Sequence, residues 1–286
     1  MAQLIDGKAI SAAVRKRIAE EIQSLQEEQG ITPGLAVILV GEDSASEVYV
    51  KNKGKACEEV GIDFELYRLS ASAIQQELEE TIRSLNDRED IDGILLQLPL
   101  PSHLDANQFV GLIRPDKDVD AFHPENIGHI MRGDFVFLPC TPAGIMELLR
   151  ASGIDPAGQR CVVIGRSDIV GKPTAMQMLH ADATVTICHS KTQNLAEVCR
   201  EADILVSAVG QAGLITGDMV RPGAVVIDVG MNRNEEGKLC GDVDFASVEP
   251  VASYITPVPG GVGPMTVAML LQNTLEAAKR HSGITG

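Results

Sequence analysis

The sequence predicts an α/β protein made of two α/β domains with a cleft between them, the second built on a doubly wound parallel sheet. Short aliphatic runs that suit buried strands alternate with longer amphipathic runs along most of the 286 residues. This order of elements is typical of parallel strands joined by right-handed helical crossovers. The alternation stops between Pro99 and Pro142 and then resumes, which divides the chain into two regions. A content of 3% aromatic residues, with no Trp, also suits buried parallel sheets.

Each element of the first region follows from its periodicity. Apolar residues at helical spacing predict helices over residues 8–28, 44–60 and 72–85, and aliphatic or alternating runs predict strands over residues 34–40, 64–69 and 93–98. The last of these strands stops sharply because Pro99 and Pro101 follow it. Parallel sheets bind ligands outside the carboxyl ends of their strands, so residues at these ends are the first candidates for a site.

The second region starts at Thr141 and Pro142, where Thr suits the N-cap and Pro the first position of a helix. Strands are expected over residues 160–164, 183–187, 203–207 and 224–229, with helical stretches between them, and a last helix over residues 267–280 follows a loop over residues 256–264. Two such regions leave a cleft between them, which is a common place for ligands to bind.

Charge, cysteine usage and hydropathy exclude several classes of function. A formal net charge of −16 argues against a nucleic-acid-binding surface. The six cysteines form no C-x-x-C pair and lie mostly in apolar runs, as in a reduced, cytoplasmic protein. The sequence has no signal peptide and no apolar run near 18 residues, so neither export nor membrane spanning is expected. His189 beside Cys188 is a weak metal signal, and we expect no metal.

A glycine-containing turn between the first strand and helix of the second region is the most informative motif. The strand breaks at Gly165, and a second glycine, Gly171, precedes the helix. This order, as in a Rossmann-like domain, can hold a phosphate on free backbone N–H groups. Arg166 suits a ribose 2′-phosphate, which indicates NADP before NAD. Ser167 stands where the usual motif has its second glycine, so an ordinary strand–turn–helix corner is an equal alternative.

Lys53 is the sharpest candidate for acid–base chemistry. On a helical wheel of residues 44–60 it falls within the apolar arc, whereas Lys51 and Lys55 fall on the polar side. A lysine that faces the interior loses solvation of its ammonium form, so its pKa is expected to fall, as a general base requires. The alternative is a lysine whose stem covers apolar surface while its head stays in water.

Three further side chains are candidates to act with this lysine. Tyr49 lies one turn earlier on the same face, where its ring either stacks on a flat ligand or belongs to the core. Gln97 ends an apolar strand, and a neutral amide there can orient an amine without adding a charge. Asp120, in a polar loop, is either a turn-capping acid or a carboxylate that binds a ring bearing an N–H/NH₂ pair.

The loop before the last helix is unusually rich in glycine and proline. Glycines permit close approach of the backbone to a ligand, and prolines restrict the loop's conformational freedom. The loop is therefore part of a binding site, a tight crossover between domains, or both. The residues concerned are Pro257, Pro259, Gly260, Gly261, Gly263 and Pro264.

Six motifs connect these features. They are YVKNK at 49–53, DGILLQLPLP at 92–101, KDVD at 117–120, PCTP at 139–142, GRSDIVG at 165–171 and ITPVPGGVGPMT at 255–266. Together, and in this order, they resemble the methylenetetrahydrofolate dehydrogenase/methenyltetrahydrofolate cyclohydrolase family. The resemblance covers essentially the whole chain, and the glycine–proline loop and the strand that ends at Gln97 are its most specific parts.

The resemblance implies a bifunctional enzyme of one-carbon metabolism. Such enzymes oxidise 5,10-methylenetetrahydrofolate to the methenyl form with NADP and hydrolyse that product to 10-formyltetrahydrofolate in the same pocket. The catalytic residues implied are Lys53 for proton transfer, Gln97 to orient it, Tyr49 to stack on the folate ring and Asp120 to hold the pterin. The implied cofactor residues are Gly165, Arg166, Ser167, Ser190 and Gly230, and the implied folate-binding residues also include Pro259, Gly260, Gly261, Gly263, Pro264 and Thr266.

The resemblance also implies a domain arrangement and an assembly. It gives a folate-binding catalytic domain over residues 1–120 completed by residues 265–286, an NADP-binding domain over residues 140–262, and a homodimer formed through the cofactor domains. One departure is Ala121, where members commonly carry glycine; if that position needs a positive φ, alanine strains the loop beside Asp120.

Two alternatives to the bifunctional enzyme remain open. One is a monofunctional NAD(P)-dependent methylenetetrahydrofolate dehydrogenase of the same fold. The other is a non-catalytic nucleotide- or folate-binding module. The joint presence of Tyr49, Lys53, Gln97 and Asp120 speaks against the module, because a sensor has no need of a buried base.

Overall fold

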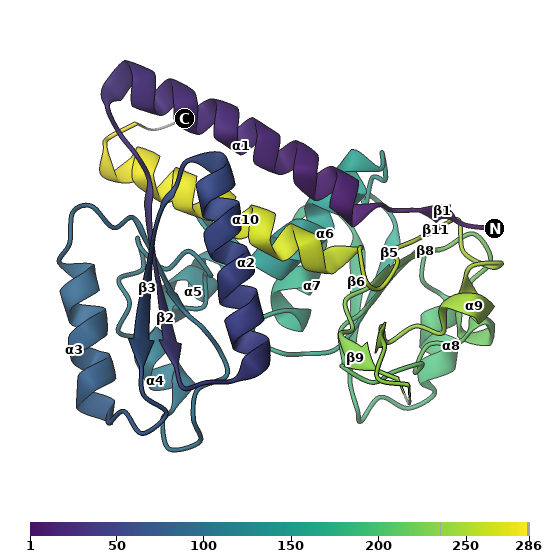
Figure 1. Ribbon diagram of the computed structural model, residues 1–286. Helices are drawn as coiled ribbons and strands as arrows, with labels where there is room; N and C mark the ends of the chain where they lie inside the picture. The colour runs from purple at the N-terminus through teal and green to yellow at the C-terminus, as the bar shows by residue number, and fades with distance from the viewer. Residues whose placement is uncertain (235, 285–286) are drawn as a thin grey trace. The chain divides into compact units, whose positions relative to one another are not determined.

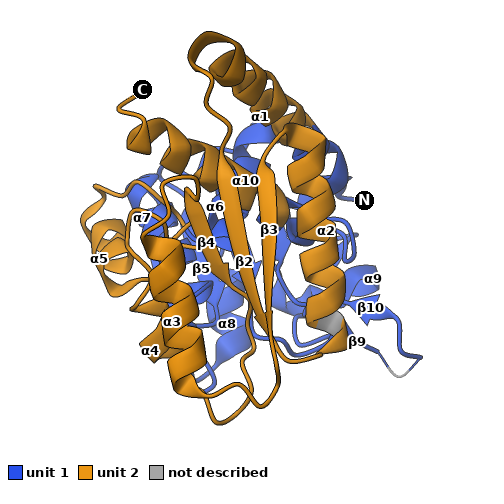
Figure 2. Cartoon of the chain, turned by 60° about the vertical axis from the view of Figure 1, so that its left-hand side comes forward, with its two compact units in different colours: residues 1–12, 139–266 blue, residues 13–138, 267–286 orange. Residues whose placement is uncertain are grey.

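The computed structural model describes residues 1–234 and 236–284, which form two compact units (Figure 2). Unit 1 combines residues 1–12 with residues 139–266, and unit 2 combines residues 13–138 with the C-terminal segment from residue 267. Helices α1 (Gly7–Gln29) and α10 (Val262–His281) each begin in unit 1 and end in unit 2.

Unit 1 contains a parallel sheet of six strands in the order β1–β11–β8–β7–β5–β6. Figure 1 labels all of these strands except β7. The chain runs from β5 to its neighbour β6 and then crosses back to pair β7 on the other side of β5. The carboxyl ends of β5 and β7 therefore form the switch point at which doubly wound sheets bind ligands. The strands are β1 (Gln3–Leu4), β5 (Arg160–Ile164), β6 (Thr184–Cys188), β7 (Ile204–Ser207), β8 (Val225–Asp228) and β11 (Tyr254–Ile255).

Helices and one small hairpin complete unit 1. The core forms because the central strands are aliphatic on both faces; Val162, Leu205 and Val226 are buried in one apolar cluster. The helices are α6 (Cys140–Ala151), α7 (Gly171–His180), α8 (Leu195–Arg200) and α9 (Phe245–Val248), with a 3₁₀ turn at Gly217–Met219, and the antiparallel hairpin consists of β9 (Asn232–Arg233) and β10 (Leu239–Cys240).

Unit 2 contains a parallel sheet of three strands in the order β3–β2–β4. Helix α3 packs on this sheet, because its buried residues Leu78 and Ile82 join Ile38 and Leu96 in one core cluster (Figure 2). The strands are β2 (Gly34–Val40), β3 (Asp63–Leu69) and β4 (Gly93–Leu96), and the helices are α2 (Ser44–Val60), α3 (Gln75–Asn86), α4 (Ala106–Val110) and α5 (Pro124–Arg132).

The predicted α/β class and the parallel, doubly wound sheet are confirmed, but some boundaries were wrong. The last helix begins at Val262 rather than residue 267, because Pro264 falls in its first turn, where a missing N–H breaks no helical bond. Helix α6 begins at Cys140 with Pro139 as its cap, two residues before the predicted N-cap Thr141. Strand β4 ends at Leu96, and α4 and α5 occupy the stretch where the alternation stops.

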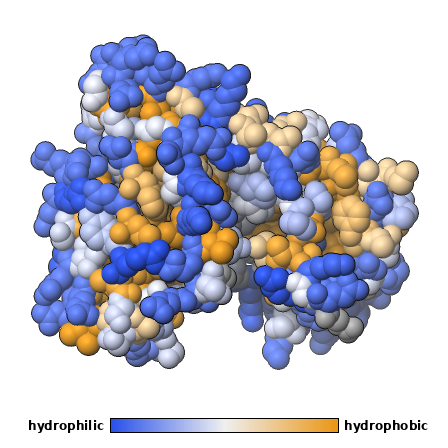
Figure 3. Space-filling model, in the orientation of Figure 1, coloured by the Kyte–Doolittle hydropathy of each residue, from blue (hydrophilic) through white to orange (hydrophobic). Residues whose placement is uncertain are grey.

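The surface agrees with the acidic composition. Hydrophilic residues cover most of the face seen in Figure 3, with smaller hydrophobic areas among them. Among the described residues, no helix combines the length and the apolar character that crossing a membrane requires.

Candidate active site

Helix α2 holds Lys53 at a fixed place because both of its ends are capped. The Asp43 carboxylate accepts a hydrogen bond of 2.8 Å from the Ser46 N–H at the first turn, and Gly61 ends the helix in the left-handed conformation, with φ of 86°. Val50 and Cys57 on the inner face are buried. The helix therefore has a defined rotation about its axis, which sets the direction of Lys53.

Lys53 and Gln97 meet in the structure. The Lys53 ammonium group donates a hydrogen bond of 2.9 Å to Gln97 Oε1, and the Gln97 amide Nε2 donates one of 2.7 Å to the Leu98 carbonyl. The second bond fixes the amide so that its oxygen faces the lysine. The pairing joins α2 to the carboxyl end of β4, as the sequence analysis proposed, and brings a neutral acceptor to a half-buried amine.

Cys57, one turn after Lys53, is not a nucleophile in this site. Burial raises the pKa of its thiol to about 12, although the nearby Lys53 charge opposes the rise. A thiol with such a pKa stays protonated and unreactive at neutral pH.

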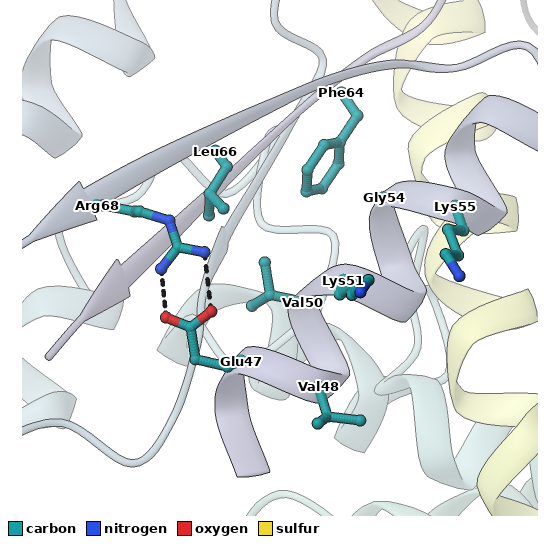
Figure 4. Close-up of a pocket in the computed structure, with 9 residues that line it drawn as sticks. All are labelled: Glu47, Val48, Val50, Lys51, Gly54, Lys55, Phe64, Leu66 and Arg68. Atoms are coloured by element: carbon teal, nitrogen blue, oxygen red, sulfur yellow. Dashed lines mark hydrogen bonds and ion pairs between the residues drawn. The ribbon is translucent and has the colours of Figure 1, made fainter. Parts of the chain in front are cut away.

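Tyr49 lies one helical turn before Lys53 and is 42% exposed. This exposure shows that Tyr49 is not a core residue. Its ring is open to solvent and available for stacking on a ligand. A separate hollow of about 380 Å³ lies between α2 and β3 (Figure 4), and its lining includes Lys51, Lys55 and the ion pair of Glu47 with Arg68. None of the predicted catalytic residues lines this hollow.

A buried network shapes the loop that carries Asp120. Asp118 pairs with Ile94 of β4 in a parallel bridge, and its carboxylate accepts bonds from the His123 N–H (2.7 Å) and from Asn126 Nδ2 (2.9 Å). Burial raises the pKa of Asp118. Asp120 follows this bridge toward the carboxyl end of β4, the same end at which Gln97 stands.

Ala121 and Asn273 also shape the loop that carries Asp120. Ala121 has φ of 57°, so the left-handed conformation suspected from the sequence is present at a buried alanine. Asn273 on α10 donates hydrogen bonds to the carbonyls of Val119 (2.8 Å) and Leu138 (2.9 Å). Sequence reasoning missed Asn273; its only signal was one polar residue within the apolar face of the last helix.

The glycine turn after β5 is built by close backbone approach. A Cβ on Gly165, whose φ is 120°, would lie 2.3 Å from the Ala208 carbonyl oxygen, and one on Gly171 would lie 2.3 Å from the Gly165 oxygen. Ser167, in place of the usual glycine, accepts bonds of 3.2 Å at its Oγ from the N–H groups of Val170 and Gly171. The turn thus lies at the switch point and leads into α7.

Arg166 and Ser190 follow neighbouring strands at the same edge of the sheet. The Gly165 N–H donates to the Cys188 carbonyl at 2.9 Å, so the ends of β5 and β6 are in register. Both Arg166 and Ser190 are exposed, and within the described part of the chain Arg166 has no ion-pair partner. The guanidinium is available to an anionic ligand.

Gly230, just after β8, is buried against Asp242. A Cβ at Gly230 would lie 2.3 Å from Asp242 Oδ1, so packing requires glycine there. Asp228 accepts hydrogen bonds of 2.9 Å from the N–H groups of Gly230 and Asp242, and one of 3.0 Å from Val243. Asp242 could not be predicted from the sequence, because a single acid after a short hairpin carries no local signal.

The glycine–proline segment packs on the start of α1. A Cβ at Gly7 would lie 1.8 Å from the Gly261 oxygen, and the Lys8 N–H donates to the Gly260 carbonyl at 3.1 Å. Gly260 and Gly261 are buried, whereas Pro259 and Gly263 are exposed. Close packing of the chain therefore accounts for Gly260 and Gly261, whereas Pro259 and Gly263 are available to a ligand.

The remaining residues of the segment lie in the first turn of α10. Ser11 donates a hydrogen bond of 3.0 Å to the Pro264 carbonyl, and the hydroxyls of Thr141 and Thr266 are 3.2 Å apart. Within residues 1–234 and 236–284, no group of three or more His, Cys, Asp and Glu side chains is arranged to hold a metal ion.

Two family models match the chain. The tetrahydrofolate dehydrogenase/cyclohydrolase catalytic domain matches residues 5–120, and the NAD(P)-binding domain of the same family matches residues 139–282. The two matches together cover both the Lys53–Gln97 pair and the glycine turn after β5.

Individual relatives are similar over nearly their full length. A protein of Moorella thermoacetica named bifunctional protein FolD is 59% identical over 279 residues, covering 98% of this chain and 99% of the relative. The structure is similar to a bifunctional methylenetetrahydrofolate dehydrogenase/cyclohydrolase of Campylobacter jejuni, with a TM-score of 0.96, 50% identity, and coverage of 98% and 99%. A Trypanosoma brucei enzyme solved with NADP and an inhibitor gives a TM-score of 0.93 at 42% identity, covering 98% of each chain.

Proposed function

This chain belongs to the tetrahydrofolate dehydrogenase/cyclohydrolase family, and from that membership we propose how its residues perform both activities. The chain is a bifunctional enzyme that oxidises 5,10-methylenetetrahydrofolate with NADP and hydrolyses the methenyl product to 10-formyltetrahydrofolate. The observation that carries the proposal for this chain's own residues is the 2.9 Å hydrogen bond between Lys53 and Gln97.

Lys53 serves the hydrolytic step. The water oxygen bonds to the one-carbon unit, and Lys53 in its neutral form accepts one water proton, which then passes to solvent. The bond from the carbon to N5 breaks, and the second water proton ends on N5, so atoms and charge balance. Gln97 holds the amine with an uncharged oxygen, which orients it without a carboxylate that would favour its ammonium form.

Tyr49 and Asp120 bind the folate. The exposed ring of Tyr49, one turn from Lys53, is suited to stack on the folate ring system. The Asp120 carboxylate, in a loop held by Asp118 and Asn273, is suited to the N–H/NH₂ edge of a pterin. The segment from Pro259 to Thr266 completes the folate-binding set in this proposal.

The glycine turn after β5 fits NADP. Glycine at positions 165 and 171 lets the turn fold tightly at the switch point and lead into α7, beside which a diphosphate can bind. Arg166, which like Ser190 follows a strand at this edge of the sheet, is suited to the 2′-phosphate, and Ser167 closes the turn by accepting hydrogen bonds from the N–H groups of Val170 and Gly171. When bound, NADP supplies the acceptor for the hydride; this chain contributes binding and orientation.

The Lys53→Met variant tests the hydrolytic role. We expect hydrolysis of methenyltetrahydrofolate to fall by roughly 10²- to 10⁴-fold, the usual contribution of a positioned acid–base group, while NADP⁺ binding is retained. Lys51→Met is the matched control, because Lys51 is exposed on the other side of α2. Unchanged hydrolysis in the Lys53 variant would refute the role. Wild-type NADPH formation with methenyl product that accumulates unhydrolysed would instead indicate a monofunctional dehydrogenase.

The Arg166→Ala variant tests the cofactor assignment. Loss of hydrogen bonds from a charged group costs about 1.5–3 kcal/mol, so the KM for NADP⁺ is expected to rise roughly 10- to 100-fold. The KM for NAD⁺, which has no 2′-phosphate, is expected to stay the same. Equal changes for both cofactors would refute the assignment. If the wild-type protein binds both ligands and turns over neither, the binding-module alternative holds.

Dimerisation through unit 1 is the assembly that we propose. Strand β6 is at the edge of the sheet, and Ile187 on it and Leu179 on α7 are exposed apolar side chains. Open strand edges pair readily with a second copy. Light scattering would give twice the chain mass of 30.5 kDa if this is correct, and Ile187→Lys would give a monomer.

A further inference from the structure

A buried carboxylate lies beneath the loops that follow β7 and β8. The Asp242 side chain is 0% exposed and accepts five hydrogen bonds. At Oδ2 the donors are the Ser207 hydroxyl (3.1 Å) and the N–H groups of Val209 (2.8 Å) and Gly210 (3.3 Å), and at Oδ1 they are the Gln211 N–H (2.8 Å) and Asn232 Nδ2 (2.9 Å).

The donors come from two separate segments at one edge of the sheet. Three consecutive N–H groups belong to residues 209–211, which begin two residues after the end of β7, and Asn232 follows β8. Segments at the carboxyl ends of parallel strands are where doubly wound folds bind dinucleotides. A single side chain therefore fixes the shape of two loops on that edge.

A second carboxylate holds the first in place. Asp228 at the end of β8 accepts a hydrogen bond of 2.9 Å from the backbone N–H of Asp242, and its own N–H donates to Thr256 Oγ1 at 2.8 Å. A Cβ at Gly241 would lie 1.7 Å from Asp228 Oδ2, so the hairpin can approach only with glycine at that position. The backbone of Asp242 is consequently fixed relative to the strand ends.

The two acceptor oxygens of the Asp242 side chain are what this arrangement requires. Five donors converge on two oxygens, and no donor atom on an aspartate competes with them. An asparagine of the same shape would turn an NH₂ group toward two or three of the donors and leave those donors unpaired. Loop 209–211 would then lose its common acceptor while the strands remain intact.

We propose that Asp242 is a positioning residue for the bound dinucleotide, acting through loop 209–211 and Gly230 at the carboxyl ends of β7 and β8. The inference rests on the proposed function. It differs from the roles of Gly165 and Arg166, which concern the diphosphate and the 2′-phosphate. It predicts that Asp242 supports oxidation, which needs a placed cofactor, and not hydrolysis, which needs none.

The test compares Asp242→Asn with Asp244→Asn. The control makes the same chemical change two residues away, at an exposed side chain that caps no helix by a hydrogen bond. For Asp242→Asn we expect the KM values for NADP⁺ and NAD⁺ to rise by the same factor, at least about tenfold, as for a misplaced binding group. Hydrolysis of methenyltetrahydrofolate without cofactor should stay within about twofold of wild type.

Several outcomes would overturn the inference. These are unchanged KM values, a change for NADP⁺ alone, or a parallel loss of hydrolysis, which would indicate general unfolding. Amide hydrogen exchange gives a direct check: N–H groups of residues 209–211 should exchange faster in Asp242→Asn, while those of Leu205 and Val206 in β7 stay protected. Unchanged exchange at 209–211 would also count against it.

A second variant and a second measurement allow the inference to be refuted even if Asp242→Asn does not fold or the wild-type protein reduces neither cofactor. If Asp242→Asn does not fold, Asn232→Ala removes one donor from the same carboxylate and should give the same pattern with a smaller rise, about threefold; an unchanged KM would refute the inference. If the wild-type protein reduces neither cofactor, the proposed function has failed, and hydrogen exchange still shows whether Asp242 orders the loop.

Discussion

Replacing Gly171 with alanine tests the physical basis of the glycine turn. The new Cβ would lie 2.3 Å from the Gly165 oxygen, 2.5 Å from its carbonyl carbon and 2.8 Å from the Arg166 nitrogen. Carbon contacts relax near 3.5 Å, so the turn must open by about 1 Å. All three atoms belong to the backbone, and no side chain can rotate away to relieve the overlap.

The expected effect follows from that displacement. A shift of about 1 Å in a binding group can reduce turnover by roughly 10²-fold, and overpacking of this kind costs about 1–3 kcal/mol of unfolding free energy. The assay is NADPH formation from methylenetetrahydrofolate, compared with hydrolysis of methenyltetrahydrofolate in the same preparation. Oxidation should fall while hydrolysis is retained.

Gly128→Ala provides the control for the Gly171 variant. Gly128 lies in α5, and a Cβ added there meets nothing within 4 Å. Oxidation at the wild-type rate with an unchanged KM for NADP⁺ in Gly171→Ala would refute the reasoning. Equal loss of both activities would show that the substitution unfolds the protein rather than opens the turn.

Three further predictions concern stability and titration. Ala121→Gly should raise the free energy of unfolding by up to about 1 kcal/mol, because φ of 57° is unfavourable for alanine; a loss in denaturant titrations would contradict this. Gln177→Met should also add about 1 kcal/mol to the free energy of unfolding, because neither buried amide atom of Gln177 has a hydrogen-bond partner among residues 1–234 and 236–284; a lower denaturation midpoint would count against it. Burial raises the pKa of Asp228 from 3.8 to about 6, so the folded chain holds this proton more tightly than the unfolded chain. The contribution of Asp228 to unfolding free energy should therefore fall as pH rises from about 4 to about 6; a carboxyl ¹³C titration midpoint near 4 would refute it.

The sequence by itself determined the repeating pattern of the fold and several candidates for the site. Burial in parallel strands leaves long aliphatic runs, and a helix face leaves a 3.6-residue period, so both are visible without coordinates. Such a period predicted that Lys53 lies on the inner arc of α2. The motif that contains Lys53 and the motif that contains Gln97 together predicted that these two side chains act as a pair, and the structure joins them by a hydrogen bond. Gly165 and Gly171 were visible because glycine marks a turn that other residues enter with strain.

Only the tertiary structure decided the contacts that join distant segments. Asp242 accepts a hydrogen bond from Ser207, 35 residues away, and Asn273 donates to Val119, 154 residues away. No local period records such a bond, because it depends on the order of strands in the sheet and on the rotation of a helix about its axis. The start of α10 was predicted wrongly for a related reason. Local propensity favours a loop at Gly263 and Pro264, yet packing against α1 and α6 completes a helical turn there. Local chemistry thus fixed which elements form, and long-range packing fixed which polar groups meet.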